Sequence, residues 1–251
     1  MIIYISGGEI GIIQLGAMDL GLIETLFDQH SGSPFFVKDA GLRYVASNRA
    51  MARLCGVRTS RDLVGRRAGD FFPAGLAEHY EALDREVLET GRTMSNVLED
   101  TAGPDGERAW LLFVRVPVRD ASGRAVGIAA NARSLPNGKA TEACYRRLKA
   151  ATDRIRRSFD QRLSLRAIAS EAGMSITQFE RDFRKVFDMT PSAFLHSLRL
   201  DQARTLLDDP SQSVAAIAHA CGYADHSAFS RRFLAETGMT PSKYRKRRRA
   251  G

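Results

Sequence analysis

The sequence predicts an α+β domain, with a five-stranded antiparallel sheet and helices, followed by an all-α domain with two helix-turn-helix units. Two patterns predict this order: short apolar strands separated by turn residues fill residues 33–135, and an internal duplication fills residues 165–245. The charge divides at the same boundary, since residues 1–135 hold 15 basic and 17 acidic side chains and residues 136–251 hold 22 and 12. A chain of 251 residues is long enough for two modest domains.

Residues 1–19 are expected to form an irregular leader before the first domain. The stretch is apolar in patches, but Gly7, Gly8 and Glu9 interrupt it and it is too short to span a bilayer. Lys38 is the first basic residue, so the positively charged start of a signal peptide is missing. We therefore expect no membrane segment here, and both Met1 and Met18 stay open as the first residue of the protein.

Five strands are predicted between residues 33 and 135. The turn Asp39-Ala40-Gly41 joins the first two, because Asp and Gly adopt turn dihedrals at low cost. The runs Gly103-Pro104-Asp105-Gly106 and Asp120-Ala121-Ser122-Gly123 separate the last three. The predicted strands are 35–38, 43–47, 93–101, 108–119 and 125–133.

Two helices are predicted between the second and third strands. Asn48 is the expected N-cap of a short helix that runs through Cys55. A longer helix over residues 74–89 spaces its apolar residues four, three and four positions apart and ends at Gly91. Those apolar residues are Leu76, Tyr80, Leu83 and Val87.

Scattered positions in this region match a known family. They are Phe36-Val37-Lys38-Asp39, Asn48, Gly65 before Asp70-Phe71-Phe72, Thr90-Gly91, Gly106 before Trp110, Gly123 and Gly127. Together they make residues 20–135 resemble a PAS domain, which implies an α+β PAS-like fold. Members of the family either bind a small ligand between sheet and helices or form dimer interfaces, and the resemblance leaves both roles open. We therefore name no cofactor, and the ligand of the PAS-like domain is unknown.

One histidine raises the question of a haem ligand. Haem-binding PAS domains resemble this layout with a histidine on the long helix, where His79 lies, but a lone histidine is better explained by a surface or capping role. A flavin photoreceptor needs a reactive cysteine directly after the helix-opening Asn48, and Arg49 stands there. Both interpretations are therefore disfavoured.

The cysteines and histidines predict neither a disulfide framework nor a metal site. Cys55, Cys144 and Cys221 are widely separated and odd in number, which fits a reducing cytoplasm. The histidines show no metal-ligand spacing with each other or with the cysteines, so we expect no metal. They are His30, His79, His196, His219 and His226. We also find no catalytic motif and expect no enzyme activity.

A short linker is expected at residues 136–143, because Pro136-Asn137-Gly138 interrupts regular structure. The second domain, residues 144–251, then opens with a strongly basic helix that runs to about Phe159. The concentrated positive charge favours a polyanionic partner, most often nucleic acid, although a solvated basic face stays open.

The duplication is the most informative feature of the second domain. Ala167-Ile168-Ala169 recurs as Ala216-Ile217-Ala218, offset by 49 residues, and Met189-Thr190-Pro191-Ser192 recurs as Met239-Thr240-Pro241-Ser242, offset by 50. Each copy is typical of a short helix, a glycine-containing turn and a longer second helix. We therefore predict helix-turn-helix units over residues 165–187 and 214–237.

The second helix of each unit presents matched side chains to the outside. Successive residues turn by about 100° on an α-helix, so with Phe179 inward, Thr177 and Arg181 face outward. Ser227 and Arg231 take the same places in the second unit. An outward arginine can bond guanine O6 and N7 together, and a hydroxyl can contact a base or a phosphate. A solvated face explains one such arginine, but it does not explain matched residues in both copies.

The second domain also matches a known family over a long stretch at fixed spacing. The matching residues are Arg199, Ala203, Leu206, Leu207, Val214, Ile217-Ala218, Cys221-Gly222-Tyr223, Asp225, Ser227, Phe229, Arg231-Arg232-Phe233 and Gly238-Met239-Thr240-Pro241-Ser242-Lys243-Tyr244-Arg245. The domain closely resembles the AraC/XylS transcription regulators. Members of that family place two helix-turn-helix units, joined by a rigid helix, in neighbouring segments of the major groove of DNA. Leu234 departs from the family, which usually has a basic residue there, and this removes one expected phosphate contact.

The resemblance carries DNA contacts over by position. The candidates for reading bases are Ile176, Thr177, Gln178, Glu180 and Arg181 in the first unit and Asp225, His226, Ser227, Ser230 and Arg231 in the second. Glu180 could equally pair with Arg184 one turn later, and we leave both roles open. The candidates for phosphate contacts are Arg184, Lys185, Arg232, Arg245, Lys246 and Arg247, and the tail through Arg249 is either bound or solvated.

These observations predict a cytoplasmic, sequence-specific DNA-binding transcription regulator. Double-stranded DNA is the expected partner, and RNA polymerase and a small-molecule effector are further candidates. The PAS-like domain is expected to sense a small-molecule or redox signal or to form a homodimer. Two alternatives stay open: a PAS-like domain that is only a ligand-free interaction platform, and a DNA-binding module fused to a DNA-repair enzyme. Such enzymes use a zinc-bound cysteine cluster, against which the three scattered cysteines argue.

Overall fold

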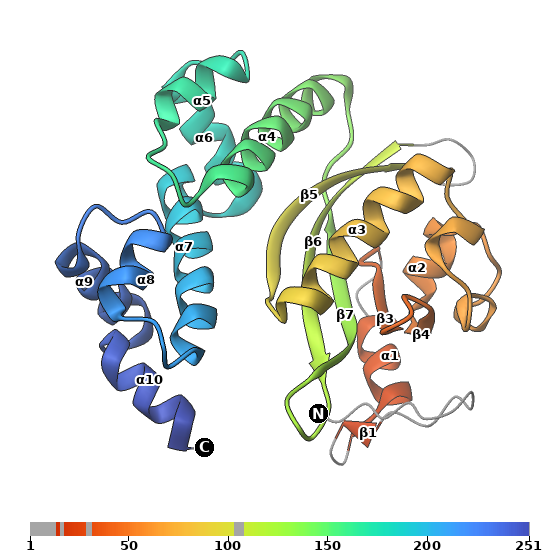
Figure 1. Cartoon of the computed structure of the whole chain (residues 1–251). Coiled ribbons are helices and arrows are strands. Elements are labelled where there is room, and N and C mark those ends of the chain that lie inside the picture. The colour runs from red at the N-terminus through yellow and green to blue at the C-terminus, as the bar shows by residue number, and fades with distance from the viewer. Residues whose placement is uncertain (1–13, 16–17, 29–31, 103–107, 251) are drawn as a thin grey trace. The chain divides into compact units, whose positions relative to one another are not determined.

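A computed structural model describes residues 14–15, 18–28, 32–102 and 108–250 of the chain (Figure 1). The chain divides into two compact units, Met1–Glu142 and Ala143–Gly251. No helix within the described ranges is long and apolar enough to cross a membrane. Of the predicted leader, Gln14–Leu15 (β1) and Met18–Asp19 (β2) pair as an antiparallel ladder, and the remainder lies outside the described residues.

The first unit is built on an antiparallel sheet with the order β4-β3-β7-β6-β5, which confirms the five-stranded sheet predicted from the sequence. The pairing of β3 with β7 joins segments far apart in the chain, whereas β6 and β7 follow each other directly. The strands are Phe35–Asp39 (β3), Tyr44–Ser47 (β4), Met94–Ala102 (β5), Arg108–Arg119 (β6) and Ala125–Ser134 (β7).

Helices pack on both faces of this sheet, and their ends follow from the local sequence. The side-chain oxygen of Asn48 accepts hydrogen bonds from the backbone N–H of Met51 and of Phe35, both at 3.0 Å, so the predicted cap also ties the helix to β3. Gly91 ends the long helix at a φ of 62°, as predicted. The helices of this unit are Leu20–Asp28 (α1), which the sequence patterns did not predict, Arg49–Leu54 (α2), Ser60–Leu63 (η1), Ala68–Asp70 (η2) and Ala74–Thr90 (α3).

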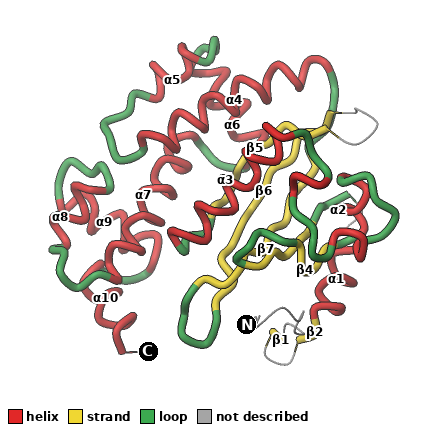
Figure 2. The backbone as a smooth tube through the Cα atoms, turned by 45° about the vertical axis from the view of Figure 1, so that its right-hand side comes forward, coloured by secondary structure: helices red, strands yellow, loops and turns green. Residues whose placement is uncertain are grey.

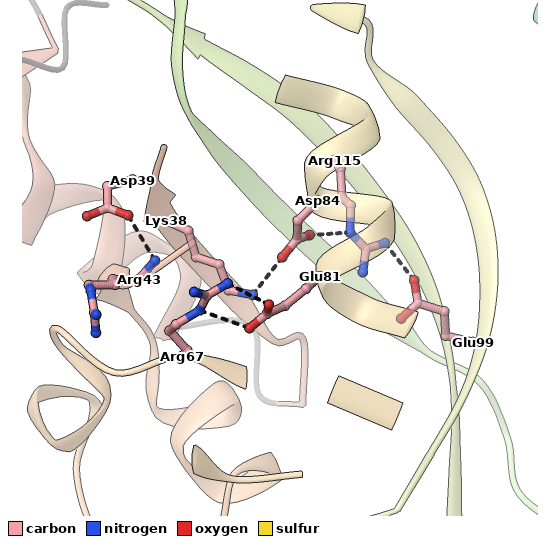
Figure 3. A network of polar contacts seen from close by, with 8 residues as sticks. All are labelled: Lys38, Asp39, Arg43, Arg67, Glu81, Asp84, Glu99 and Arg115. Carbon is pink, nitrogen blue, oxygen red and sulfur yellow. Dashed lines mark hydrogen bonds and ion pairs between the residues drawn. The ribbon is translucent and has the colours of Figure 1, made fainter. Parts of the chain in front are cut away.

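The buried stripe of α3 differs from the predicted one. Ala77, Tyr80, Asp84 and Val87 are buried, whereas the predicted Leu76 and Leu83 are only partly buried at the edge of the core. The helix is rotated so that the Asp84 carboxylate is buried toward the sheet (Figure 3), whereas Leu83 is only partly buried. The physical reason is that two cations of the sheet, Lys38 and Arg115, lie under this position and pair with Asp84.

The second unit consists of helices, which confirms the predicted fold class. The first of them, α4, begins at Lys139, so residues 139–143 of the predicted linker are helical. The interruption ends at Gly138, whose carbonyl oxygen accepts from the Glu142 N–H and from the Thr141 hydroxyl at 2.9 and 2.8 Å. The helices are Lys139–Ser158 (α4), Leu165–Glu171 (α5), Ile176–Phe187 (α6), Pro191–Asp208 (α7), Val214–Ala220 (α8), His226–Thr237 (α9) and Pro241–Ala250 (α10).

The duplication predicted from the sequence is preserved in the backbone. The helix pairs α5–α6 and α8–α9 lie within the predicted ranges, and α7 runs between the two pairs (Figures 1 and 2). The turn glycines Gly173 and Gly222 have φ values of 67° and 76°, a region that side chains with a Cβ adopt at a cost. Glycine at these two positions therefore fixes both turns.

Side-chain caps repeat in register with the turns. Ser164 and Ser213 cap α5 and α8 by accepting from the third backbone N–H of each helix, and Ser175 and Asp225 do the same for α6 and α9. Inside each unit two phenylalanines one turn apart are fully buried, which confirms their inward placement. They are Phe179 and Phe183 in the first unit and Phe229 and Phe233 in the second.

Candidate nucleic-acid interface

The outward face of α6 carries the predicted contact residues of the first unit. Thr177, Glu180 and Arg181 are exposed, as are Arg184 and Lys185, whereas Ile176 and Gln178 are half-buried. The exposure of Thr177 and Arg181 agrees with the helical-angle prediction. The side chain of Arg181 is 71% exposed, and its Nε donates to Asp182 Oδ1 at 2.9 Å. This neighbour holds the guanidinium near the helix surface while leaving most of it open to a ligand.

Glu180 had two candidate roles in the sequence. Within the part of the chain that the structure describes, no ion pair joins its carboxylate to Arg184. Both side chains are exposed on the same face of α6. The pairing alternative therefore lacks support in the free protein, and the Glu180 carboxylate is open to solvent.

The outward face of α9 carries the predicted contact residues of the second unit. His226, Ser227 and Arg231 are exposed and Ser230 is half-buried. The Nε2 atom of His226 lies 3.4 Å from the Ser230 hydroxyl. Asp225 is exposed but already employed, because its Oδ1 accepts from the Ala228 N–H at 2.7 Å as the cap of the helix. It has one carboxylate oxygen outside that bond.

The basic residues predicted to contact phosphates fall into two groups. Arg184, Lys185, Lys246 and Arg247 are exposed. Arg232 instead pairs with Glu236 at 3.3 Å, and the Nε of Arg245 donates to the Leu207 carbonyl at the end of α7. The latter two therefore have structural partners in the free protein. The tail predicted as either bound or solvated is helical as part of α10.

A buried arginine joins the linking helix α7 to the second helix-turn-helix unit. Arg199 on α7 donates from Nε to the Phe159 carbonyl and from Nη2 to the Gln161 carbonyl, both at 2.8 Å. Its guanidinium also lies over the ring of Tyr223, 5.5 Å from the centroid. The family resemblance included Arg199 without a role. In the structure, Arg199 holds the segment that follows α4 against the turn of the second helix-turn-helix unit.

A second polar site lies inside the N-terminal compact unit, and it was not predicted from the sequence. Asp84 on α3 pairs with Lys38 Nζ at 2.6 Å and with Arg115 Nε at 2.9 Å, and Arg115 Nη1 pairs with Glu99 at 2.6 Å (Figure 3). All four residues are at most 2% exposed. Burial lowers the pKa of Arg115, but the carboxylates of Glu99 and Asp84 more than offset this and raise it. Arg115 therefore remains a cation in the core.

The residues considered for haem or redox chemistry lie elsewhere. His79 is exposed on α3 and is not among the residues that line the pocket beside the buried charges. Burial raises the pKa of the Cys55 thiol to about 12, and burial with the Asp182 carboxylate raises that of Cys144. Protonated thiols are poor nucleophiles, so these pKa shifts lower the reactivity of both thiols. Among the described residues no group of three His, Cys, Asp or Glu side chains could hold a metal ion.

Comparisons with known proteins agree with both units. Residues 168–247 match the family described as "Helix-turn-helix domain", and residues 28–135 match the family described as "PAS fold". The transcriptional activator RhaR of Mannheimia succiniciproducens is 34% identical over 101 residues, covering 40% of this chain and 37% of RhaR. RhaS of Escherichia fergusonii is 37% identical over 92 residues, covering 37% of this chain and 33% of RhaS. The chain thus spans about a third of the length of these curated relatives.

One solved structure completes the comparison. A transcriptional regulator with an AraC-type DNA-binding domain from Chromobacterium violaceum is 31% identical, with 43% of this chain and 96% of that chain covered and a TM-score of 0.39. From the family matches and the curated relatives, the second unit carries an AraC-type helix-turn-helix domain and the first unit carries a PAS fold.

Proposed function

We propose that the protein is a sequence-specific DNA-binding transcription regulator that places α6 and α9 in neighbouring segments of the major groove. The observation that carries this proposal is the duplicated unit, in which Thr177 and Arg181 on one helix match Ser227 and Arg231 on the other, all exposed. A helix of this diameter fits the major groove, and an arginine there can bond both acceptors of guanine. The basic excess of residues 136–251 supplies the attraction to phosphates.

Bases and phosphates are assigned to different side chains in this proposal. The base contacts come from Ile176, Thr177, Gln178, Glu180 and Arg181 and from Asp225, His226, Ser227, Ser230 and Arg231. The phosphate contacts come from Arg184, Lys185, Lys246 and Arg247, which are exposed. Arg232 and Arg245 join them only if their present partners, Glu236 and the Leu207 carbonyl, are released.

The N-terminal unit is proposed to sense a small molecule. The pocket with its buried charges supports this role over a ligand-free platform, and the raised pKa values of Cys55 and Cys144 disfavour a thiol-based redox signal. We further propose a homodimer formed through residues 20–135, with residues 144–251 binding DNA and RNA polymerase as the downstream partner. The site of action is then the cytoplasm.

We propose a regulator rather than an enzyme fused to a DNA-binding module. The curated relatives RhaR and RhaS are transcriptional activators. The repair-enzyme alternative needs clustered cysteines, whereas Cys55 lies in one unit and Cys144 and Cys221 in the other.

Selection from a random duplex library with the full chain tests this function. We expect the enriched DNA to hold two conserved blocks whose centres are about 10 base pairs apart, since neighbouring major-groove segments on one face of DNA are one helical turn apart. A variant with Arg157→Ala, an exposed basic residue of α4 outside both recognition helices, serves as the control and should select the same blocks. Binding without enrichment of any sequence would contradict the proposal.

A further inference from the structure

The first unit contains a pocket between α3 and the inner face of the sheet that the DNA-binding function does not use. The pocket is partly open to solvent. One part of its wall is apolar, formed by Phe36, Tyr44, Met51, Leu54, Phe72 and Phe113. The other part is polar and includes the four buried charged residues together with Tyr80 and Thr101.

The buried charges of the pocket balance each other. Lys38 and Arg115 supply two positive charges, and Asp84 and Glu99 supply two negative ones, in one continuous chain of ion pairs (Figure 3). The Lys38 ammonium also lies over the rings of Phe36 and Tyr44, at 4.9 and 4.6 Å from their centroids. An ionised ligand would add a charge with no counter-charge in a buried place, which is costly. The wall therefore favours an uncharged occupant.

One polar atom of the same wall, Glu99 Oε2, has no hydrogen-bond partner within the protein, and its residue is 1% exposed. The hydroxyls of Tyr80 and Thr101 interact only with each other, which leaves one of their two protons free to be donated. Buried polar atoms are almost always paired, so a free carboxylate oxygen and a free hydroxyl proton that line one pocket indicate a missing partner. Burial raises the pKa of Tyr80, so its hydroxyl keeps its proton. Glu99 Oε2 is a carboxylate oxygen, which can accept a hydrogen bond but cannot donate one.

We infer that this pocket binds a small uncharged molecule with an apolar body and a polar end, which donates an O–H or N–H to Glu99 Oε2 and accepts from Tyr80 or Thr101. This inference rests on the sensor role proposed for the N-terminal unit. Glu99 is the specificity-determining residue, because its free oxygen accepts a hydrogen bond and offers none. The ion pair with Arg115 fixes the orientation of the carboxylate.

Three probes of similar size test the inference on the full chain. Phenol is uncharged and has both a donor and an acceptor on an apolar ring, toluene lacks the polar group, and benzoate carries a charge. Ligand-observed NMR titration should show that phenol binds at least about tenfold more tightly than toluene, because toluene leaves the buried polar atoms unpaired. Benzoate should bind more weakly than phenol by at least about the same factor, because its charge is unbalanced.

Variants of the polar wall separate this site from unspecific binding. Glu99→Gln turns a donor toward the pocket and should lower phenol affinity about tenfold. Thr101→Val should reduce the preference of the pocket for phenol over toluene without disturbing the ion pairs. Thr101→Val keeps the test valid if Glu99→Gln weakens folding through the loss of charge beside Arg115. Ser47→Ala is the control, because Ser47 is buried on β4 but does not line the pocket.

Each outcome decides for or against the inference. Toluene binding as tightly as phenol, benzoate binding most tightly, or no probe binding at millimolar concentration would overturn it. Equal phenol affinity in Thr101→Val, Glu99→Gln and Ser47→Ala would also overturn it. DNA affinity measured on the same preparations distinguishes the two proposals. A chain that discriminates phenol from toluene but does not bind DNA would contradict the proposed function and support the pocket inference, and the reverse result would do the opposite.

Discussion

The turn glycine of the first helix-turn-helix unit, Gly173, has no atom within 4 Å of the place where a Cβ would stand, whereas the same position of the second unit, Gly222, is crowded. A Cβ at Gly222 would lie 2.7 Å from the Asp160 carbonyl oxygen and 2.9 Å from that of Phe159. Both positions require glycine because φ is positive, but only at Gly222 does the missing side chain also leave room for the backbone of Asp160. A duplicated sequence can thus repeat a fold while its copies meet different surroundings.

The two recognition helices differ in the same manner. Their inward phenylalanines and their caps correspond, but Arg181 of the first unit pairs with Asp182, and no ion pair is found for Arg231 in the described residues. The first helix adds Glu180 to its outward face, where the second has Ser230. The shared positions build the unit, and the differing ones give each helix its own set of donors and acceptors for DNA.

Alanine at the two turn glycines should separate their roles most clearly. Gly173→Ala is expected to cost about 1 kcal/mol of unfolding free energy, from left-handed backbone strain alone. Gly222→Ala should cost about 3 kcal/mol or more, because the new methyl must also displace the backbone at Asp160. Urea unfolding of the full chain, followed by helical circular dichroism, measures both. Equal losses would show that the approach at Gly222 is not tight in solution.

The caps give a smaller effect that should be alike in the two units. Ser175→Ala and Asp225→Ala should each lower the unfolding free energy by about 1 kcal/mol, since each removes the acceptor for a helix N-terminal N–H. Asp225→Ser keeps the cap and should restore most of the stability. Asp225→Ser that is as unstable as Asp225→Ala, in the same denaturation assay, would show that the carboxylate does more than cap.

A histidine against the second unit predicts the smallest effect, which depends on pH. Burial, with the nearby cations Arg232 and Arg199, lowers the pKa of His196, while Glu236 opposes this. The unfolded chain then binds the proton more readily than the folded one. His196 therefore makes the protein less stable as the pH falls below 6.5, the ordinary pKa of a histidine. Thermal unfolding midpoints from about pH 8 to about pH 5 should fall less for His196→Gln than for the natural chain. Parallel curves would contradict this.

The fold of the C-terminal compact unit was predictable because the sequence patterns that determine it are local. Caps, turn glycines and inward phenylalanines such as Phe179 and Phe229 recur within short segments, and each fixes the structure of its own few residues. The exposure of the matched Arg181 and Arg231 followed from the helical period alone. Their contacts to bases remain a prediction, since a free chain has no DNA to show them.

The buried charges of the first unit were not predictable in the same way. Lys38 and Asp84 are 46 residues apart in the chain, and Arg115 is 31 residues from Asp84, so only the folded sheet brings them together. A signal was present: Lys38, Glu99 and Arg115 each stand two positions after an inward apolar residue on a strand, the place where another apolar residue is expected. Charged residues at inward-facing positions of three strands indicate a polar pocket.

The most direct test of the account measures which helix reads which half of the DNA site. With the sequence from the library selection, affinity is titrated for the intact site, for sites with one block randomised, and for random duplex, at several salt concentrations. Arg181→Ala should lose about 1–3 kcal/mol of discrimination at one block only, and Arg231→Ala should lose it at the other. Arg247→Ala, the control, should weaken binding to all duplexes equally and flatten the salt dependence. Arginine variants that lose affinity for intact and random DNA to the same extent would contradict the account, because both helices would then hold only the phosphate backbone.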